Sequence, residues 1–307
     1  MENLPENLDI DPIEVWGGGA DQSSERTRIE QCIELLNHPS CREEALALLN
    51  KERRCKDMPL LLWNAKNLSY VLLQEISRAY TMLSPPTLNM KDATRVCNAL
   101  ALLQSMASHP DTRMNVVRAK MPIYIYPFMN TTEKGVKHFD YLRLTSLGVI
   151  GALVKVEDTN SPEIIHFLLE SEMFPLCLRC VEVGTELAKT VALFVISKIL
   201  STDQGKQYCG TFPERFFAVS RVLGNTIDEF PGKPSSHLLK HILTCFMRLS
   251  EVSRPREALT KCYPAKLRDP TYLNFACDDA AVRSLADRVL QNLSEQSAAG
   301  SSTSASY

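Results

Sequence analysis

The chain has 307 residues, of which 45% are hydrophobic, and a formal net charge of −2. That apolar content suffices for a core, while the near-neutral charge excludes a chain that binds nucleic acid through its overall charge. No apolar run approaches the roughly 20 residues that a membrane-spanning helix needs, so we expect no membrane association.

The first residues and the cysteines indicate where the protein resides. Residues 1–21 are acidic and contain a Gly triplet but no apolar core, so they are unlike a secretory signal and predict a disordered arm. The ten cysteines are spread mostly singly, many of them within helical apolar patterns, which is typical of reduced, buried thiols. We therefore expect the protein in the cytoplasm or the nucleus.

Helical periodicity begins directly after the arm. Apolar residues recur at helical spacing from Ile29 to Leu36. Residues 58–83 predict two helices or one kinked helix, and residues 91–129 predict a further pair. A polar loop is expected at residues 130–140.

The segment Tyr141–Val156 is apolar most of the way round a helix, which is typical of a helix buried on several sides. It contains Gly148 and Gly151, and each glycine costs roughly 1 kcal/mol of helix propensity. We predict a structural role for both, because a missing Cβ lets the backbone of a neighbouring helix come close.

Further amphipathic and buried helices are expected from residue 161 onward, the last of them at residues 280–293. Residues 295–307 have the low-complexity composition of a disordered tail. No segment alternates with a period of two residues, so we expect no sheet.

One unit recurs along the chain: a buried aliphatic helix, a polar turn and a short helix. The buried helices are expected to end near Ala107, Val154, Leu200 and Leu249, at or slightly above the roughly 40–47 residues of armadillo and HEAT repeats. Stacking such units buries the apolar face that each would expose alone. We predict an all-α fold over residues 22–294, an armadillo/HEAT-like right-handed superhelix of stacked helical repeats with a concave groove.

Motifs for catalysis, metals or cofactors are missing from the sequence. Cys177 and Cys180 form a lone CxxC in an amphipathic helical pattern, whereas structural zinc needs four ligands, so we interpret them as core residues. His237 and His241 lack the intervening Glu of the zinc-protease motif. No nucleophile elbow, dinucleotide-binding pattern or P-loop occurs. We predict a protein that is not an enzyme and holds no metal or cofactor.

Arginines near the turns of the later units are the informative polar residues. Successive turns of a solenoid bring the same edge of each unit together, so arginines there can line a positive groove. Such a groove suits peptide carbonyls and aromatic side chains, or a single-stranded nucleic-acid backbone. The alternative is a solvated edge with ordinary ion pairs. These arginines are Arg143, Arg215, Arg221, Arg248, Arg254 and Arg256.

Several stretches resemble the required-for-cell-differentiation family. The resemblance is most specific in DYLRLTSLGVIGALVK at 140–155, and it includes RVCNALALLQSMASHP at 95–110 and LLKHILTCFMRLS at 238–250. It implies an armadillo-repeat subunit of the carbon-catabolite-repressor/NOT deadenylase complex that is not itself a nuclease. Such a subunit docks on the NOT scaffold subunit and offers hydrophobic pockets to tryptophans of silencing or mRNA-binding proteins. Single-stranded nucleic-acid binding and homodimer formation are also implied.

The resemblance also implies particular site residues. The scaffold-binding surface corresponds to a helix at 62–77, where this chain departs from the family's residue types at Asn64, Lys66 and Tyr70. Gly148 matches a family glycine in the central helix. In the peptide-binding region, Pro213 stands where the family has an aromatic residue. The implied peptide-binding residues are Pro213, Glu214, Arg215, Arg254 and Arg256.

The sequence thus predicts a non-catalytic adaptor subunit of that deadenylase complex, acting in mRNA decay and translational repression. Its groove would bind peptide segments that carry tryptophan. Two alternatives remain open. One is an armadillo protein that binds single-stranded nucleic acid through an arginine-lined groove, and the other is a generic solenoid scaffold with a partner outside this pathway.

Overall fold

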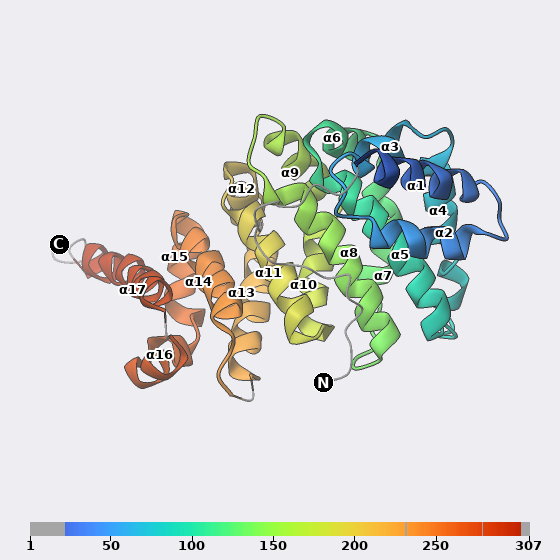
Figure 1. The fold of residues 1–307 in the computed structure, drawn as a ribbon. Coiled ribbons are helices and arrows are strands. Elements are labelled where there is room, and N and C mark those ends of the chain that lie inside the picture. Colours follow the sequence, from blue (N-terminus) through green and yellow to red (C-terminus); the bar gives the residue numbers. More distant parts are fainter. Residues whose placement is uncertain (1–21, 231, 278, 302–307) are drawn as a thin grey trace. The chain divides into compact units, whose positions relative to one another are not determined.

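A computed structural model describes residues 22–301 except 231 and 278. Within these residues the secondary structure consists of α-helices and short 3-10 helices, with no strand (Figure 1). The prediction of an all-α fold is therefore confirmed for the described part of the chain. The predicted arm at residues 1–21 and the last residues of the predicted tail, 302–307, lie outside it.

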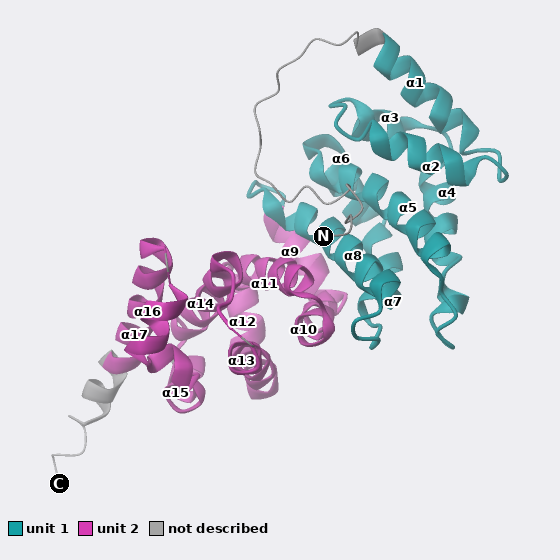
Figure 2. Ribbon diagram, turned by 60° about the horizontal axis from the view of Figure 1, so that its bottom comes forward, with its two compact units in different colours: residues 1–160 teal, residues 161–307 magenta. Residues whose placement is uncertain are grey.

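The helices divide into two compact units, residues 1–160 and residues 161–307 (Figure 2). The single array predicted over residues 22–294 stays a prediction. The described elements of the first unit, in chain order, are α1 (Gln22–Leu35), α2 (Arg42–Lys51), α3 (Met58–Asn64), α4 (Leu68–Ser77), η1 (Tyr80–Met82), α5 (Met90–Ser108), α6 (Pro110–Arg118), η2 (Met121–Ile125), α7 (Tyr126–Met129) and α8 (Lys137–Lys155).

The second unit contains the later helices, in which long buried helices again alternate with shorter ones. Its described elements are α9 (Ser161–Glu170), α10 (Met173–Val183), α11 (Glu186–Leu200), α12 (Asp203–Thr211), α13 (Pro213–Asp228), α14 (Ser236–Ser250), α15 (Ser253–Cys262), η3 (Ala265–Arg268), α16 (Pro270–Ala276) and α17 (Ala280–Ser301). Helix α17 continues past residue 293, where the sequence pattern predicted its end.

The recurring unit of the sequence is visible in the helix ends. Helices α5, α8, α11 and α14 end at Ser108, Lys155, Leu200 and Ser250, each within one residue of the predicted position. A short helix follows each of these four ends: α6 after α5, α9 after α8, α12 after α11 and α15 after α14, as the repeat pattern requires. Apolar periodicity thus located the buried helices correctly, because apolar residues that recur every three or four positions form the side of a helix that is buried.

Helix α8 is the buried helix of the first unit. Fourteen of its 19 residues are buried, including Gly151, and its main packing partner is α5. At Gly148 a Cβ would lie 2.7 Å from Oε1 of Gln104, a side chain of α5. The close neighbour at this glycine is therefore the end of a flexible side chain, whereas the sequence argument had placed a backbone there.

Candidate peptide-binding and scaffold-binding surfaces

The structure brings the predicted peptide-binding residues to the starts of two neighbouring helices. Pro213, Glu214 and Arg215 form the first turn of α13, while Arg254 and Arg256 lie in the first turn of α15. The two helices contact one another within the second unit.

Helices α13 and α15 run side by side in the same direction. Near their starts, a Cβ added to Gly210, at the end of α12, would lie 3.2 Å from Cγ1 of Val252, directly before α15. Further along, Ser220 Oγ in the middle of α13 lies 3.2 Å from Sγ of Cys262, the last residue of α15. We call the surface that these two helices share the α13–α15 face. The predicted residues occupy its amino-terminal end.

An aromatic side chain that the sequence argument missed lies beside Arg215. Pro213 is the first residue of α13, where its fixed φ suits a helix start, and Phe212 is the N-cap with an extended φ of −118°. Phe212 is 51% exposed, and the Arg215 guanidinium carbon lies 4.7 Å from its ring centroid. An exposed aromatic ring therefore lies one residue before Pro213, the position at which the resemblance implies an aromatic residue. The sequence signal that could have identified this ring is the phenylalanine directly before Pro213.

Arg215 is stacked on a second ring as well. Its guanidinium carbon lies 3.8 Å from the ring centroid of Tyr208, and its Nη1 donates a hydrogen bond of 3.4 Å to the Tyr208 carbonyl. Burial raises the pKa of Tyr208, and the Arg215 charge opposes that rise, so the phenol is neutral near pH 7. No carboxylate of the described residues forms an ion pair with Arg215. Its positive charge remains available to a ligand.

The two predicted arginines of α15 have different environments. Arg256 donates from Nε to the Ser250 carbonyl at 2.5 Å and from Nη2 to the Glu251 carbonyl at 3.5 Å. It therefore satisfies carbonyl groups at the end of α14, a structural role common for arginine near a helix C-terminus. Arg254 is exposed and has no ion-pair or hydrogen-bond partner among the described residues.

A largely apolar groove of about 330 Å³ extends along the carboxyl-terminal half of the α13–α15 face. Phe217, which is 51% exposed, lies at this groove and packs edge-on against Phe216 at 5.1 Å between centroids. Sequence reasoning missed it, because Phe217 continues an apolar pattern that is otherwise buried. The groove is lined by Phe217, Ser220, Arg221, Gly224, Asn225, Asp228, Cys262 and Pro264.

Three of the six arginines expected at a positive edge are neutralised within their own unit. Arg143 is fully buried, and its guanidinium donates to Asp140 at 2.6 Å and to the Glu133 carbonyl. It belongs to a helix buried on most sides, so its placement in a groove was wrong. Arg221 and Arg248 form ion pairs with carboxylates at 3.4 Å and 2.7 Å.

The predicted scaffold-binding residues lie in the first unit, around a break between two helices. Asn64 ends α3, Lys66 is in the following turn and Tyr70 is in the first turn of α4; all three are exposed. Two helices were one of the two alternatives predicted for residues 58–83, and the structure has them; the surface that the resemblance places at residues 62–77 spans their junction. The chain turns at Asn67, whose φ of 62° is the left-handed conformation that Asn tolerates better than most residues.

The remaining candidates from the sequence do not converge on a reactive centre. Cys177 and Cys180 are buried in α10, and no described group of three or more His, Cys, Asp or Glu residues is placed to hold a metal ion. All ten cysteines are free thiols. Among the described helices, none has both the length and the hydropathy to cross a bilayer.

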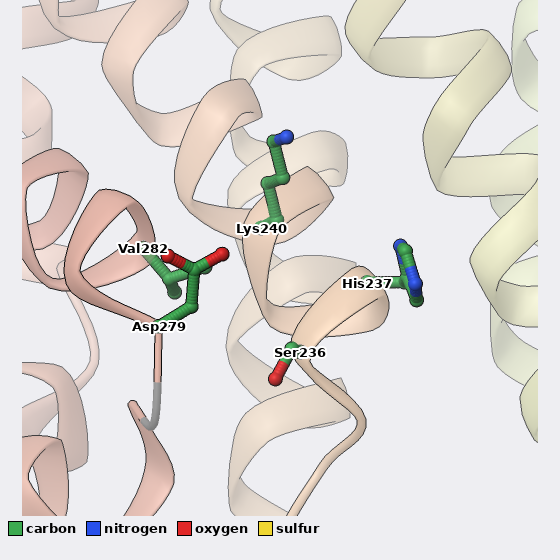
Figure 3. A pocket seen from close by; sticks show the side chains of 5 residues that line it. All are labelled: Ser236, His237, Lys240, Asp279 and Val282. Carbon is green, nitrogen blue, oxygen red and sulfur yellow. The ribbon is translucent and has the colours of Figure 1, made fainter.

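A pocket of about 260 Å³ lies between the start of α14 and the start of α17. Figure 3 shows that the side chains of His237 and Lys240 point in different directions, and that the His237 ring points away from Asp279 on the neighbouring segment. Four residues on, burial lowers the pKa of His241 to about 4, and its ring packs edge-on against Phe194 at 5.6 Å. Neither histidine has the surroundings of a metal ligand or general base.

Two curated relatives are similar to most of this chain. Cell differentiation protein rcd1 of Schizosaccharomyces pombe is 48% identical over 268 residues, 87% of this chain and 93% of that protein. Protein CAF40 of Saccharomyces cerevisiae is 40% identical over 287 residues, 93% of this chain and 76% of that protein.

Solved structures support the fold. A designed armadillo repeat protein superposes with a TM-score of 0.55 at 14% identity, covering 86% of this chain and 99% of that chain. A second designed armadillo repeat protein, in complex with the peptide (KR)4, gives a TM-score of 0.54 at 13% identity, again over 86% of this chain and 99% of its own. The predicted armadillo fold is thereby confirmed. The profile of the Rcd1-like cell differentiation family matches residues 32–293, and this chain therefore belongs to that family.

Proposed function

We propose that this protein is a non-catalytic adaptor subunit of the carbon-catabolite-repressor/NOT deadenylase complex and binds tryptophan-bearing peptide segments on the α13–α15 face. Membership of the Rcd1-like family supports the link to that complex. The carrying observation is the stack of Arg215 between Tyr208 and the half-exposed Phe212. Cytoplasmic mRNA decay and translational repression are the processes in which such an adaptor acts.

The α13–α15 face offers a tryptophan two favourable contacts. Its indole can be buried against the exposed rings of Phe212 or Phe217, and aromatic pairs add about 0.5–1.5 kcal/mol beyond the buried area. The Arg215 charge can face the indole, and cation–π contacts contribute about 0.5–2 kcal/mol. Together these match the few kcal/mol of an aromatic hot spot at an interface.

The same proposal assigns scaffold docking to the first unit. Asn64, Lys66 and Tyr70 would contact the NOT scaffold subunit, and the exposed ring of Tyr70 would be the apolar anchor. The exposed lysine would stay at the rim, where its charged end keeps its water. A pull-down with the scaffold subunit tests this part, because a generic solenoid scaffold with another partner would not retain it.

A fluorescein-labelled peptide with two tryptophans in a Gly/Ser background tests the peptide site by fluorescence anisotropy. The Arg215→Ala, Arg254→Ala double variant should lose binding of this peptide while its circular dichroism stays unchanged. Arg288→Ala, a change at an exposed arginine of α17, is the matched control and should bind normally. Undiminished binding by the double variant would remove the site from the proposal.

Single-stranded nucleic acid is the second candidate ligand of this face. Stacked aromatic rings next to arginine, and an arginine without a carboxylate partner, are also what sequence-tolerant binders of single strands use. Salt separates the two ligands, because phosphate contacts make affinity fall steeply with ionic strength and ring burial does not. Labelled oligouridine and the tryptophan peptide should therefore be compared across a salt series.

A further inference from the structure

A buried carboxylate in the first unit gathers three arginine side chains. Glu75 of α4 is only 3% exposed. Arg42 Nη1 lies 3.3 Å from its Oε1, Arg95 Nε lies 2.6 Å from its Oε2, and Arg78 Nη1 lies 3.7 Å from the same Oε2. The carboxylate orients these guanidinium groups but carries one negative charge against three positive ones.

A second carboxylate extends this network without balancing it. Glu43 of α2 pairs with Arg95 at 3.5 Å and with Lys91 at 3.4 Å. The four cations Arg42, Arg78, Lys91 and Arg95 therefore face the two carboxylates of Glu43 and Glu75, which leaves two positive charges in surplus. We call these six residues the Glu75 network.

The network is held in place by the burial of two of its arginines. The side chains of Arg42 and Arg95 are only 15% and 14% exposed, so they cannot move apart into solvent. Charges that are partly removed from water and fixed close together are weakly screened, and an incoming anion gains more from them than from a free lysine. The planar guanidinium group of arginine can also donate two parallel hydrogen bonds to one carboxylate.

An exposed aromatic ring belongs to the same face. Tyr70 and Gln74 of α4 and Arg78, its C-cap residue, are spaced four residues apart and therefore lie on one side of the helix. Gln74 Nε2 donates to the Tyr70 hydroxyl at 2.9 Å, and Arg42 Nη1 donates to Gln74 Oε1 at 3.2 Å. The Tyr70 ring, 64% exposed, and the charge surplus are therefore connected by hydrogen bonds.

We call the surface formed by Tyr70, Gln74 and the Glu75 network the α4 face. From its surplus of positive charge we infer that the α4 face binds an acidic partner segment. Its Asp or Glu side chains would lie over Arg78 and Lys91, and an apolar side chain would pack on Tyr70. The inference rests on the proposed function, since this is the face assigned to scaffold docking. It adds the chemistry of the partner: a carboxylate-rich stretch rather than a purely apolar one.

The probe is a fluorescein-labelled peptide of eight glutamates followed by Leu-Phe, with a glutamine peptide of the same length as its comparison. The variant is Arg78→Gln, Lys91→Gln, which removes the two positive charges in surplus. These two side chains are 42% and 77% exposed, and the Arg78 contact to the buried carboxylate is the longest of the three, so the fold should survive. The control is Lys134→Gln, Lys155→Gln, an equal charge change at exposed lysines of the same unit outside the network.

We expect wild type and control to bind the glutamate peptide, and not the glutamine peptide, with an affinity that falls between about 0.05 and about 0.5 M salt. The network variant should bind at least about tenfold more weakly, the factor that corresponds to about 1.4 kcal/mol. Equal binding by the network variant and the control overturns the inference. So does wild-type binding that is absent or independent of salt.

A scaffold pull-down with Tyr70→Ala keeps this inference apart from the proposed function. If wild type does not retain the NOT scaffold but still binds the glutamate peptide through the network, the docking proposal fails and the inference about the acidic segment stands. If the scaffold is retained and the network variant binds the peptide like the control, the inference fails and docking stands.

Discussion

Replacing Glu75 by Gln keeps the shape of a side chain in the first unit but removes the buried charge that orients Arg42, Arg78 and Arg95. The side chains of Glu75, Arg42 and Arg95 are 4%, 15% and 14% exposed, so these three groups lie largely out of water. An amide oxygen can still accept one hydrogen bond. It cannot offset the positive charge of two guanidinium groups that stay buried beside it.

The expected cost follows from that burial. Removing one partner of a buried ion pair costs about 3–5 kcal/mol, because the other charge is left uncompensated. Arg95 retains Glu43 at 3.5 Å, which places Glu75→Gln at the lower end, about 3 kcal/mol. For a unit of this size each kcal/mol lowers the melting temperature by about 2–4 °C, so we expect a loss of about 6–12 °C.

Circular dichroism during thermal and urea unfolding measures this loss. Glu43→Gln is the matched control, because its side chain is 44% exposed and belongs to the same network. An exposed pair contributes about 0–1 kcal/mol, so the control should unfold close to wild type. If Glu75→Gln and Glu43→Gln unfold at the same temperature, burial does not set the strength of this network and our reasoning about it is wrong.

Three further predictions concern stability. Burial lowers the pKa of His241 to about 4, below its value in the unfolded chain. As the pH falls, the unfolded chain therefore takes up this proton before the folded one does. The free energy of unfolding should decrease by at most about 3 kcal/mol between about pH 6.5 and about pH 4. Urea unfolding at several pH values should show this slope in wild type and a flatter one in His241→Phe.

Gly148→Ala should be nearly neutral, since only the flexible end of Gln104 must move, whereas Gly148→Leu should cost about 1–3 kcal/mol. At Gly205 a Cβ would overlap the Ile199 carbonyl, so Gly205→Ala should cost about 3 kcal/mol or more, and equal melting temperatures for the two alanine variants would contradict this.

The positions of the buried helices could be predicted from the sequence, because each depends on the pattern of residues within one continuous segment. A buried helix needs an apolar residue every three or four positions, and that period located the ends of α5, α8, α11 and α14. The burial of Cys177 and Cys180 followed from the same pattern. The break between α3 and α4 was predicted only as one of two alternatives, because the apolar pattern continues on both sides of the left-handed Asn67.

The site was less accessible to such reasoning. Arg143 and Arg215 look alike in the sequence, each near a turn of a repeat. One is fully buried and bound to Asp140, while the other is stacked on Tyr208 and keeps its charge for a ligand. The carboxylate of Asp140 is only three residues from Arg143, but the burial of this pair depends on the helices packed around α8, and a linear pattern does not record them.

The sequence by itself determined that this chain forms stacked helices of the Rcd1-like family, because apolar period and local resemblance are both carried by neighbouring residues. The tertiary structure decided which polar side chains remain free. It gathered Arg42 of α2 and Arg95 of α5 around Glu75 of α4, whereas the contacts of Phe212 with Arg215 and of Arg78 with Glu75 join residues three apart in the sequence. Whether a charge is neutralised or available depends on distance and burial, which only the packed chain defines.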